Sequence, residues 1–173
     1  MNQCNYLKRV LDKFQMSGCK PKSVPCDPSV NNEVFLDSEK LVDAKLYREI
    51  VGSLIYIMMV TRPDICFVVT KLSQYMSNPS KADFSLAKYV LRYLKGTLHY
   101  DLKFSKSDDE LKESGFCDSD WGSSSDRRSI TGYCFQLYSK GSLISWKSKK
   151  QIIVARSSCE AEYVSLTCAI QEA

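Results

Sequence analysis

The sequence predicts an α+β protein in which an N-terminal helical segment precedes an antiparallel meander and a final helix. Three observations predict this class. Apolar residues recur at helical spacing over most of 4–95, short alternating runs follow Gly96, and a capping signal at Ser157 opens one last helix. The 173 residues suffice for one ordinary domain, or for a small module with the edge of another.

Four helices are predicted before Gly96. Their apolar stripes lie at 4–16, 43–59, 64–77 and 81–95. The last three read as one packed helical unit over 40–96.

Glycine and proline set the borders of these helices. Gly18, Pro21, Pro25 and Pro28 favour an extended connector that continues to about residue 32. Pro63 suits the first turn of the third helix. Gly96 suits the C-cap of the fourth, so we expect that helix to end there.

The period changes after Gly96, where Tyr100, Leu102 and Phe104 alternate, and the segment that follows predicts a meander. Short strand-like runs lie at 115–121, 132–138, 142–146 and 152–155, after a polar loop at 105–112. Turn-like segments at 122–128, 139–141 and 147–151 separate them. A helix over 158–172 closes the chain.

Composition is that of an ordinary folded protein, since 44% of the residues are hydrophobic and 25% are charged. The longest apolar stretch, 51–60, is too short to span a bilayer, and no secretory segment is visible at the N-terminus. We therefore expect an intracellular protein, cytoplasmic or nuclear, with no membrane partner. The net charge of +4 permits a polyanionic partner without requiring one.

The cysteines give little support to a metal–thiolate site. None of the eight belongs to a C-x-x-C pair, and His99 is the only histidine. Cys66, Cys134 and Cys168 lie in apolar runs, where a thiol packs as a small hydrophobic group. We expect reduced cysteines and no small-molecule cofactor.

Two acids are candidates for divalent-metal ligands. Asp118 follows an apolar strand-like run, and Glu162 lies in the first turns of the last helix, so their carboxylates could converge. The alternative for Asp118 and Asp120 is a turn role with local backbone hydrogen bonds. The alternative for Glu162 is a salt bridge to a lysine or arginine.

Glu160 has a different expected role. Ser157 and Glu160 fit the S-x-x-E capping box, so Glu160 should serve the helix start. Glu162 instead heads a stripe with Ser165, Leu166, Ala169 and Ile170 that we expect to face the sheet. A buried acid is costly unless it is paired or metal-bound.

Basic residues form candidate contacts to a nucleic acid backbone. Lys147, Lys149 and Lys150 make a dense run at an expected hairpin tip beside Trp146, and Arg127 and Arg128 lie in the preceding turn. A further group lies on the polar side of the helix at 81–95: Lys81, Lys88, Arg92 and Lys95. Simple solvation is the alternative for these cations, and core burial is the alternative to base stacking for Trp121 and Trp146.

At these residues the sequence resembles the Pol polyproteins of copia-type retrotransposons. The resemblance rests on blocks that occur in order: YREIVGSLIY at 47–56, TRPDI at 61–65, LRYLKGT at 91–97, DSDW at 118–121, DRRS at 126–129, TGY at 131–133, ISWKSKKQ at 144–151 and SSCEAEY at 157–163. The blocks span most of the chain.

The resemblance implies a C-terminal end of a reverse transcriptase and its connection over 1–105. It implies the first half of a ribonuclease H-like domain over 113–173. In that family, acids bind Mg²⁺ and cut the RNA of RNA–DNA hybrids; by motif position, Asp118 resembles the first acid and Glu162 the second.

The family's two later nuclease aspartates would fall beyond Ala173, and the polymerase aspartates before Met1. We therefore expect an incomplete metal site with little or no cleavage by this chain alone, and a longer Pol product as a possible partner. Two alternatives stay open. One is a nucleic-acid-binding module without enzymatic activity; the other is an effector-like interaction protein, since RYLK at 92–95 is close to an R-x-L-R motif.

Overall fold

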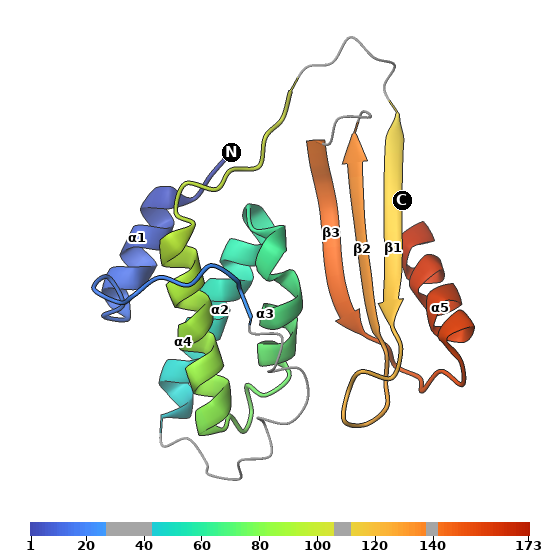
Figure 1. The fold of residues 1–173 in the computed structure, drawn as a ribbon, viewed down its shortest axis with the longest axis horizontal. Coiled ribbons are helices and arrows are strands. Elements are labelled where there is room, and N and C mark those ends of the chain that lie inside the picture. Colours follow the sequence, from blue (N-terminus) through green and yellow to red (C-terminus); the bar gives the residue numbers. More distant parts are fainter. Residues whose placement is uncertain (27–42, 106–111, 138–141) are drawn as a thin grey trace. The chain divides into compact units, whose positions relative to one another are not determined.

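The computed structural model describes residues 1–26, 43–105, 112–137 and 142–173. Part of the expected connector with Pro28, most of the polar loop at 105–112 and the turn at 139–141 lie outside the described residues. The chain divides into two compact units, Met1–Asp101 and Leu102–Ala173, and the fold is α+β (Figure 1).

The first unit is helical. Its described elements are α1 (Cys4–Lys13), α2 (Ala44–Val60), the 3-10 helix η3 (Pro63–Ile65), α3 (Cys66–Ser73) and α4 (Lys81–Gly96). Each α-helix buries one stripe in a shared core; in α2 it comprises Tyr47, Ile50, Val51, Leu54 and Ile57, all at most 1% exposed. Burial of this stripe is the main stabilising contribution of α2.

Side-chain caps start two of these helices. The Asp43 carboxylate accepts a hydrogen bond from the Leu46 amide at 2.9 Å at the start of α2. Ser80 and Asp83 form a reciprocal capping box at the start of α4.

A buried cation joins α4 to the turn after α2. Arg62 is 1% exposed, and its guanidinium donates to the Asp64 carboxylate and to the carbonyl and hydroxyl oxygens of Thr97. Tyr93 of α4 also donates to Asp64, at 2.6 Å. The buried charge is therefore paired and hydrogen-bonded, as its burial requires.

Several expected helix borders differ from the structure: the helix expected over 4–16 ends at Lys13, and the one expected over 158–172 ends at Ile170. The helix expected over 64–77 begins as the 3-10 helix η3 at Pro63 and continues as α3, which ends at Ser73. Gly96 is the last residue of α4, and Thr97 is the C-cap. A Cβ on Gly96 would lie 3.0 Å from the Lys22 carbonyl oxygen, so Gly96 allows the 21–22 segment to approach the helix.

The second unit is a three-stranded antiparallel sheet with one helix. The strands β1 (Glu113–Asp120), β2 (Ile130–Leu137) and β3 (Ser142–Lys150) pair in chain order. Helix α5 (Ser158–Ile170) packs on β1 and β2 (Figure 1).

The expected fourth strand at 152–155 is wrong. Ile152 and Val154 are 75% and 54% exposed, and residues 151–157 form a loop between β3 and α5. An apolar β-branched run becomes a strand only where it pairs and packs, and β3 already uses the neighbouring edge of β2.

The packed stripe of α5 also differs from expectation. Ala161, Ser165 and Ala169 are its buried residues, whereas Leu166 and Ile170 are 44% and 66% exposed. Small residues at spacings of four allow α5 to lie close to the sheet.

Candidate metal-binding edge of the sheet

Asp118 lies near the end of β1, the strand that forms one edge of the described sheet. Cys117 pairs with Tyr133 of β2, and both pack with Ala169 of α5, so their side chains lie on the face that α5 covers. Because successive side chains of a strand alternate, the exposed Asp118 side chain projects from the opposite face.

Glu162 reaches β1 from α5. Its Oε1 accepts a hydrogen bond from the backbone N–H of Ser119 at 3.2 Å, and Glu162 is half-buried. The Ser119 nitrogen is bonded to the Asp118 carbonyl carbon, so Glu162 Oε1 lies within roughly 6 Å of the Asp118 Cα. Glu162 makes no ion pair within the described parts of the chain.

Glu162 therefore contacts the main chain of Ser119, the residue directly after Asp118, but the two carboxylates lie on different faces of the sheet. Glu162 approaches from the covered face, whereas Asp118 projects from the open one, and the two make no direct contact. Across the described residues, no group of three or more histidine, cysteine or acidic side chains is placed to hold a metal. The structure thus brings two oxygen donors to one end of β1.

Ser165 fixes the helix beside these acids. Its hydroxyl is fully buried and donates to the Asp118 carbonyl oxygen at 2.6 Å. Sequence reasoning placed Ser165 only in a stripe facing the sheet; the signal that could have identified its role was its position one helical turn after Glu162.

Glu160 caps the helix, as its spacing from Ser157 predicts, with one difference. The Ser157 hydroxyl accepts from the Glu160 N–H at 3.2 Å. The Glu160 carboxylate accepts from the N–H of Arg156 at 2.6 Å, one residue before the N-cap. This contact leaves Glu160 with a structural function.

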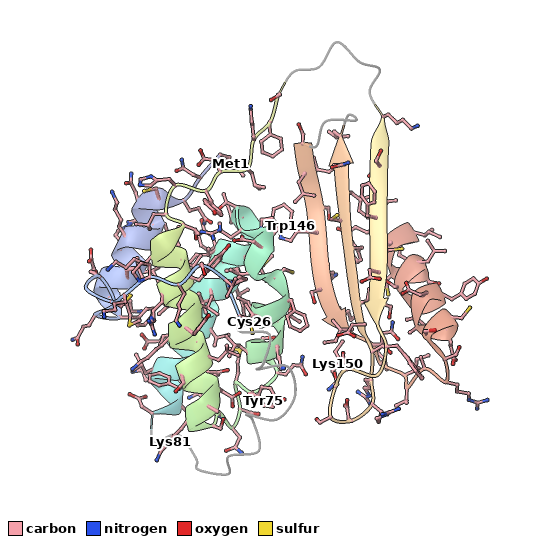
Figure 2. The ribbon with its side chains drawn as sticks, viewed as in Figure 1. Met1, Cys26, Tyr75, Lys81, Trp146 and Lys150 are labelled. Atoms are coloured by element: carbon pink, nitrogen blue, oxygen red, sulfur yellow. The ribbon has the colours of Figure 1, made fainter. Side chains whose placement is uncertain are left out.

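The lysine run does not form a hairpin tip, because β3 continues to Lys150 (Figure 2). Lys147 and Lys149 pair with Tyr133 and Thr131, on the face that bears α5. Both lysines are exposed, since α5 packs on β1 and β2 rather than β3. Strand alternation sends Lys150 to the other face.

Two further candidate cations, Lys150 and Arg128, form ion pairs with Asp126. Lys150 Nζ lies 2.9 Å from its carboxylate and Arg128 Nε lies 3.7 Å from it. The hydrogen bond from Lys150 lowers the Asp126 pKa more than partial desolvation raises it, and the Arg128 contacts lower it further. Arg127 is exposed with a positive φ of 63°. Lys150 and Arg128 are thus partly neutralised by Asp126.

The two tryptophans and the α4 cations have structural contacts. Trp121 is 46% exposed rather than in the core, and its indole N–H donates to the Ala155 carbonyl at 3.0 Å. Trp146 is half-buried in β3. Arg92 and Lys95 donate to the carbonyls of Lys20 and Cys19, so they fasten the 19–22 segment to α4.

The described chain contains no helix with the length and apolar character needed to cross a membrane. No protein-family model and no solved structure matches the chain.

Three related proteins are similar over most of the chain. An uncharacterized mitochondrial protein of Arabidopsis thaliana, AtMg00810, is 42% identical over 173 residues, covering 99% of this chain and 70% of that protein. The secreted RxLR effector protein 161 of Plasmopara viticola is 45% identical over 128 residues, covering 73% of this chain and 88% of that protein.

The third is the retrovirus-related Pol polyprotein from transposon TNT 1-94 of Nicotiana tabacum. It is 40% identical over 180 residues, covering 96% of this chain. The match spans 13% of that polyprotein's length. These matches cover 96–99% of the chain and so include both units, and the chain belongs to the family of copia-type retrotransposon Pol polyproteins.

Proposed function

We propose that the second unit is the metal-binding half of a ribonuclease H-type site that acts on the RNA strand of RNA–DNA hybrids. The observation that carries this proposal is the hydrogen bond from Ser119 N–H to Glu162, which holds one carboxylate against the main chain directly after Asp118. The first unit, in the same proposal, derives from the end of a reverse transcriptase and its connection.

The donors fit Mg²⁺ in kind. This cation prefers oxygen ligands, and proteins often bind it through one or two carboxylates together with water and substrate phosphates. Asp118 and one oxygen of Glu162 would serve as these carboxylates. Bound Mg²⁺ supplies charge stabilisation to the phosphate at which the RNA strand is cut.

The side chains have distinct roles in this proposal. Glu162 is oriented by the Ser119 N–H, which donates a hydrogen bond to its carboxylate. Asp118 is exposed and can approach a phosphate backbone without losing a protein contact. Two carboxylates are fewer than a two-metal site requires, so strong cleavage needs further acids.

Lys147 and Lys149 support a contribution to binding. They are exposed two residues apart on one face of β3, and such pairs attract phosphates in a salt-dependent manner. Binding without cleavage is therefore the second candidate function.

A gel-shift titration of the 173-residue chain tests the proposal. We expect Mg²⁺ to strengthen binding to an RNA–DNA hybrid relative to EDTA, because metal, carboxylates and phosphates bind together. The gain should disappear in Asp118→Asn and Glu162→Gln. It should persist in Glu113→Gln, which removes an exposed carboxylate five residues from Asp118 on the same strand.

An equal gain in all four proteins would contradict a role for these acids. Salt-sensitive binding that ignores Mg²⁺ in every protein would favour the module without enzymatic activity.

A further inference from the structure

Gln151 joins β1, β2 and α5 through one buried amide. The residue is 4% exposed. Its Nε2 lies 3.2 Å from Ser119 Oγ, 3.1 Å from Thr131 Oγ1 and 2.9 Å from the Ala161 carbonyl oxygen. Its backbone N–H donates to the Ser129 carbonyl at 2.8 Å. Hydrogen bonds thus hold both the main chain and the side chain of Gln151 in place.

The Ala161 carbonyl determines which way the amide faces. A carbonyl oxygen can only accept, so the amide nitrogen rather than Oε1 must point toward α5. Oε1 is then buried without a hydrogen-bond partner among the described residues. A buried polar atom without a partner is unfavourable, whereas an apolar side chain would fill this space without that cost.

Gln151 contacts the residues on either side of the hydrogen bond between the Ser119 N–H and Glu162. Ser119 supplies the N–H that Glu162 accepts, and Ala161 directly precedes Glu162. Through one amide group, Gln151 therefore connects the residue that donates to Glu162 with the backbone that carries Glu162. Ser165 adds a link to the Asp118 carbonyl one helical turn further along.

We propose that Gln151 is a positioning residue, which holds Glu162 against the Ser119 amide and so sets the place of this carboxylate beside Asp118. The inference rests on the proposed function for its purpose, but the positioning itself can be tested without metal or nucleic acid. An apolar replacement should keep the packing and release the carboxylate.

Amide hydrogen exchange, followed by NMR on the full 173-residue chain, provides the test. The Ser119 amide reports the bond to Glu162, and the Tyr133 amide in β2 serves as an internal reference. Gln151→Leu should speed Ser119 exchange about two- to tenfold relative to Tyr133, the range expected for losing one hydrogen bond. Glu162→Ala should have the same selective effect.

Ser145→Ala is the matched control. It removes the 2.8 Å hydrogen bond from Ser145 to Glu172, which links the sheet to the chain just beyond the other end of α5. Ser119 exchange should stay unchanged in this variant. Unchanged Ser119 exchange in Gln151→Leu, or equal acceleration of Ser119 and Tyr133, would overturn the positioning role.

Gln151→Asn covers the case in which Gln151→Leu does not fold. Its side chain is one methylene shorter and cannot reach Ser119 and Ala161 together, so selective loss of protection at Ser119 is again expected; full protection would overturn the role. The gel-shift gain with Mg²⁺ is a separate readout. Its absence in the unmodified chain defeats the proposed nuclease site and leaves the exchange result intact.

Discussion

The Glu162 carboxylate lies 3.2 Å from the backbone nitrogen of Ser119, so helix α5 delivers an acid to the main chain directly after Asp118. Glu162 and Ser119 are 43 positions apart in sequence. Their contact exists because small buried residues of α5 let the helix lie close to β1.

Replacement of Asp118 should separate metal binding from stability. The Asp118 carboxylate is exposed and makes no hydrogen bond within the described residues, so Asp118→Asn should change the unfolding free energy by less than about 0.5 kcal/mol. Urea denaturation measures this. A large loss of stability would show that Asp118 has a structural role instead.

Cleavage by the 173-residue chain should be weak. Two carboxylates leave the charge on the reacting phosphate poorly stabilised, so incubation with a labelled RNA–DNA hybrid and Mg²⁺ or Mn²⁺ should give little product. Robust cutting that Asp118→Asn abolishes would contradict this expectation and indicate a site complete in this chain.

Loss of the buried cation should destabilise the first unit. Arg62→Ala removes the guanidinium that pairs with Asp64 and donates to Thr97, and we expect a loss of about 3–5 kcal/mol in urea denaturation. Lys13→Ala is the control, because the Lys13–Glu49 pair is exposed and screened by solvent, so its loss should cost far less. Similar losses in both variants would contradict the central role of Arg62.

Acid should weaken the same network. Burial raises the Asp64 pKa, but the hydrogen bonds from Arg62 and Tyr93 and the Arg62 charge outweigh it, so the folded-state pKa is lowered. A lowered pKa gives stability that is present above the unfolded-state pKa of aspartate and is lost as pH falls through the folded-state value. Asp64→Asn should therefore reduce the acid dependence of unfolding; an identical pH profile would refute this assignment.

Two helical glycines should respond in opposite directions to alanine. A Cβ on Gly52 in α2 meets nothing within 4 Å, so Gly52→Ala should stabilise by about 0.5–1 kcal/mol. A Cβ on Gly96 would meet backbone at 3.0 Å, so Gly96→Ala should destabilise. Thermal unfolding of both variants measures the difference, and a shift in the same direction would contradict the close approach at Gly96.

The sequence predicted the α+β class and most helices because apolar periodicity reports burial directly. The same signal misled at 152–155, where an exposed β-branched run resembles a strand. Lys147–Lys150 resembles a turn by its charge, yet pairing with β2 extends the strand through it. Strand pairing depends on neighbours that local sequence does not specify.

The candidate site was predictable in part. Motif position and helical spacing predicted Asp118 and Glu162 as candidates. The face from which Asp118 projects follows instead from which side of the sheet α5 covers. Gln151 had no periodic signature, since it follows a basic run and precedes an apolar one. Its role depends on three contacts distant in sequence.

Paramagnetic broadening by Mn²⁺ in the NMR spectrum of the 173-residue chain tests the central claim most directly. Substoichiometric Mn²⁺ should broaden the amide signals of Asp118, Ser119 and Glu162 first, and Asp118→Asn or Glu162→Gln should reduce that broadening. Glu113→Gln should leave it unchanged. Broadening centred elsewhere, or unaffected by loss of either acid, would contradict a metal site at this edge of β1.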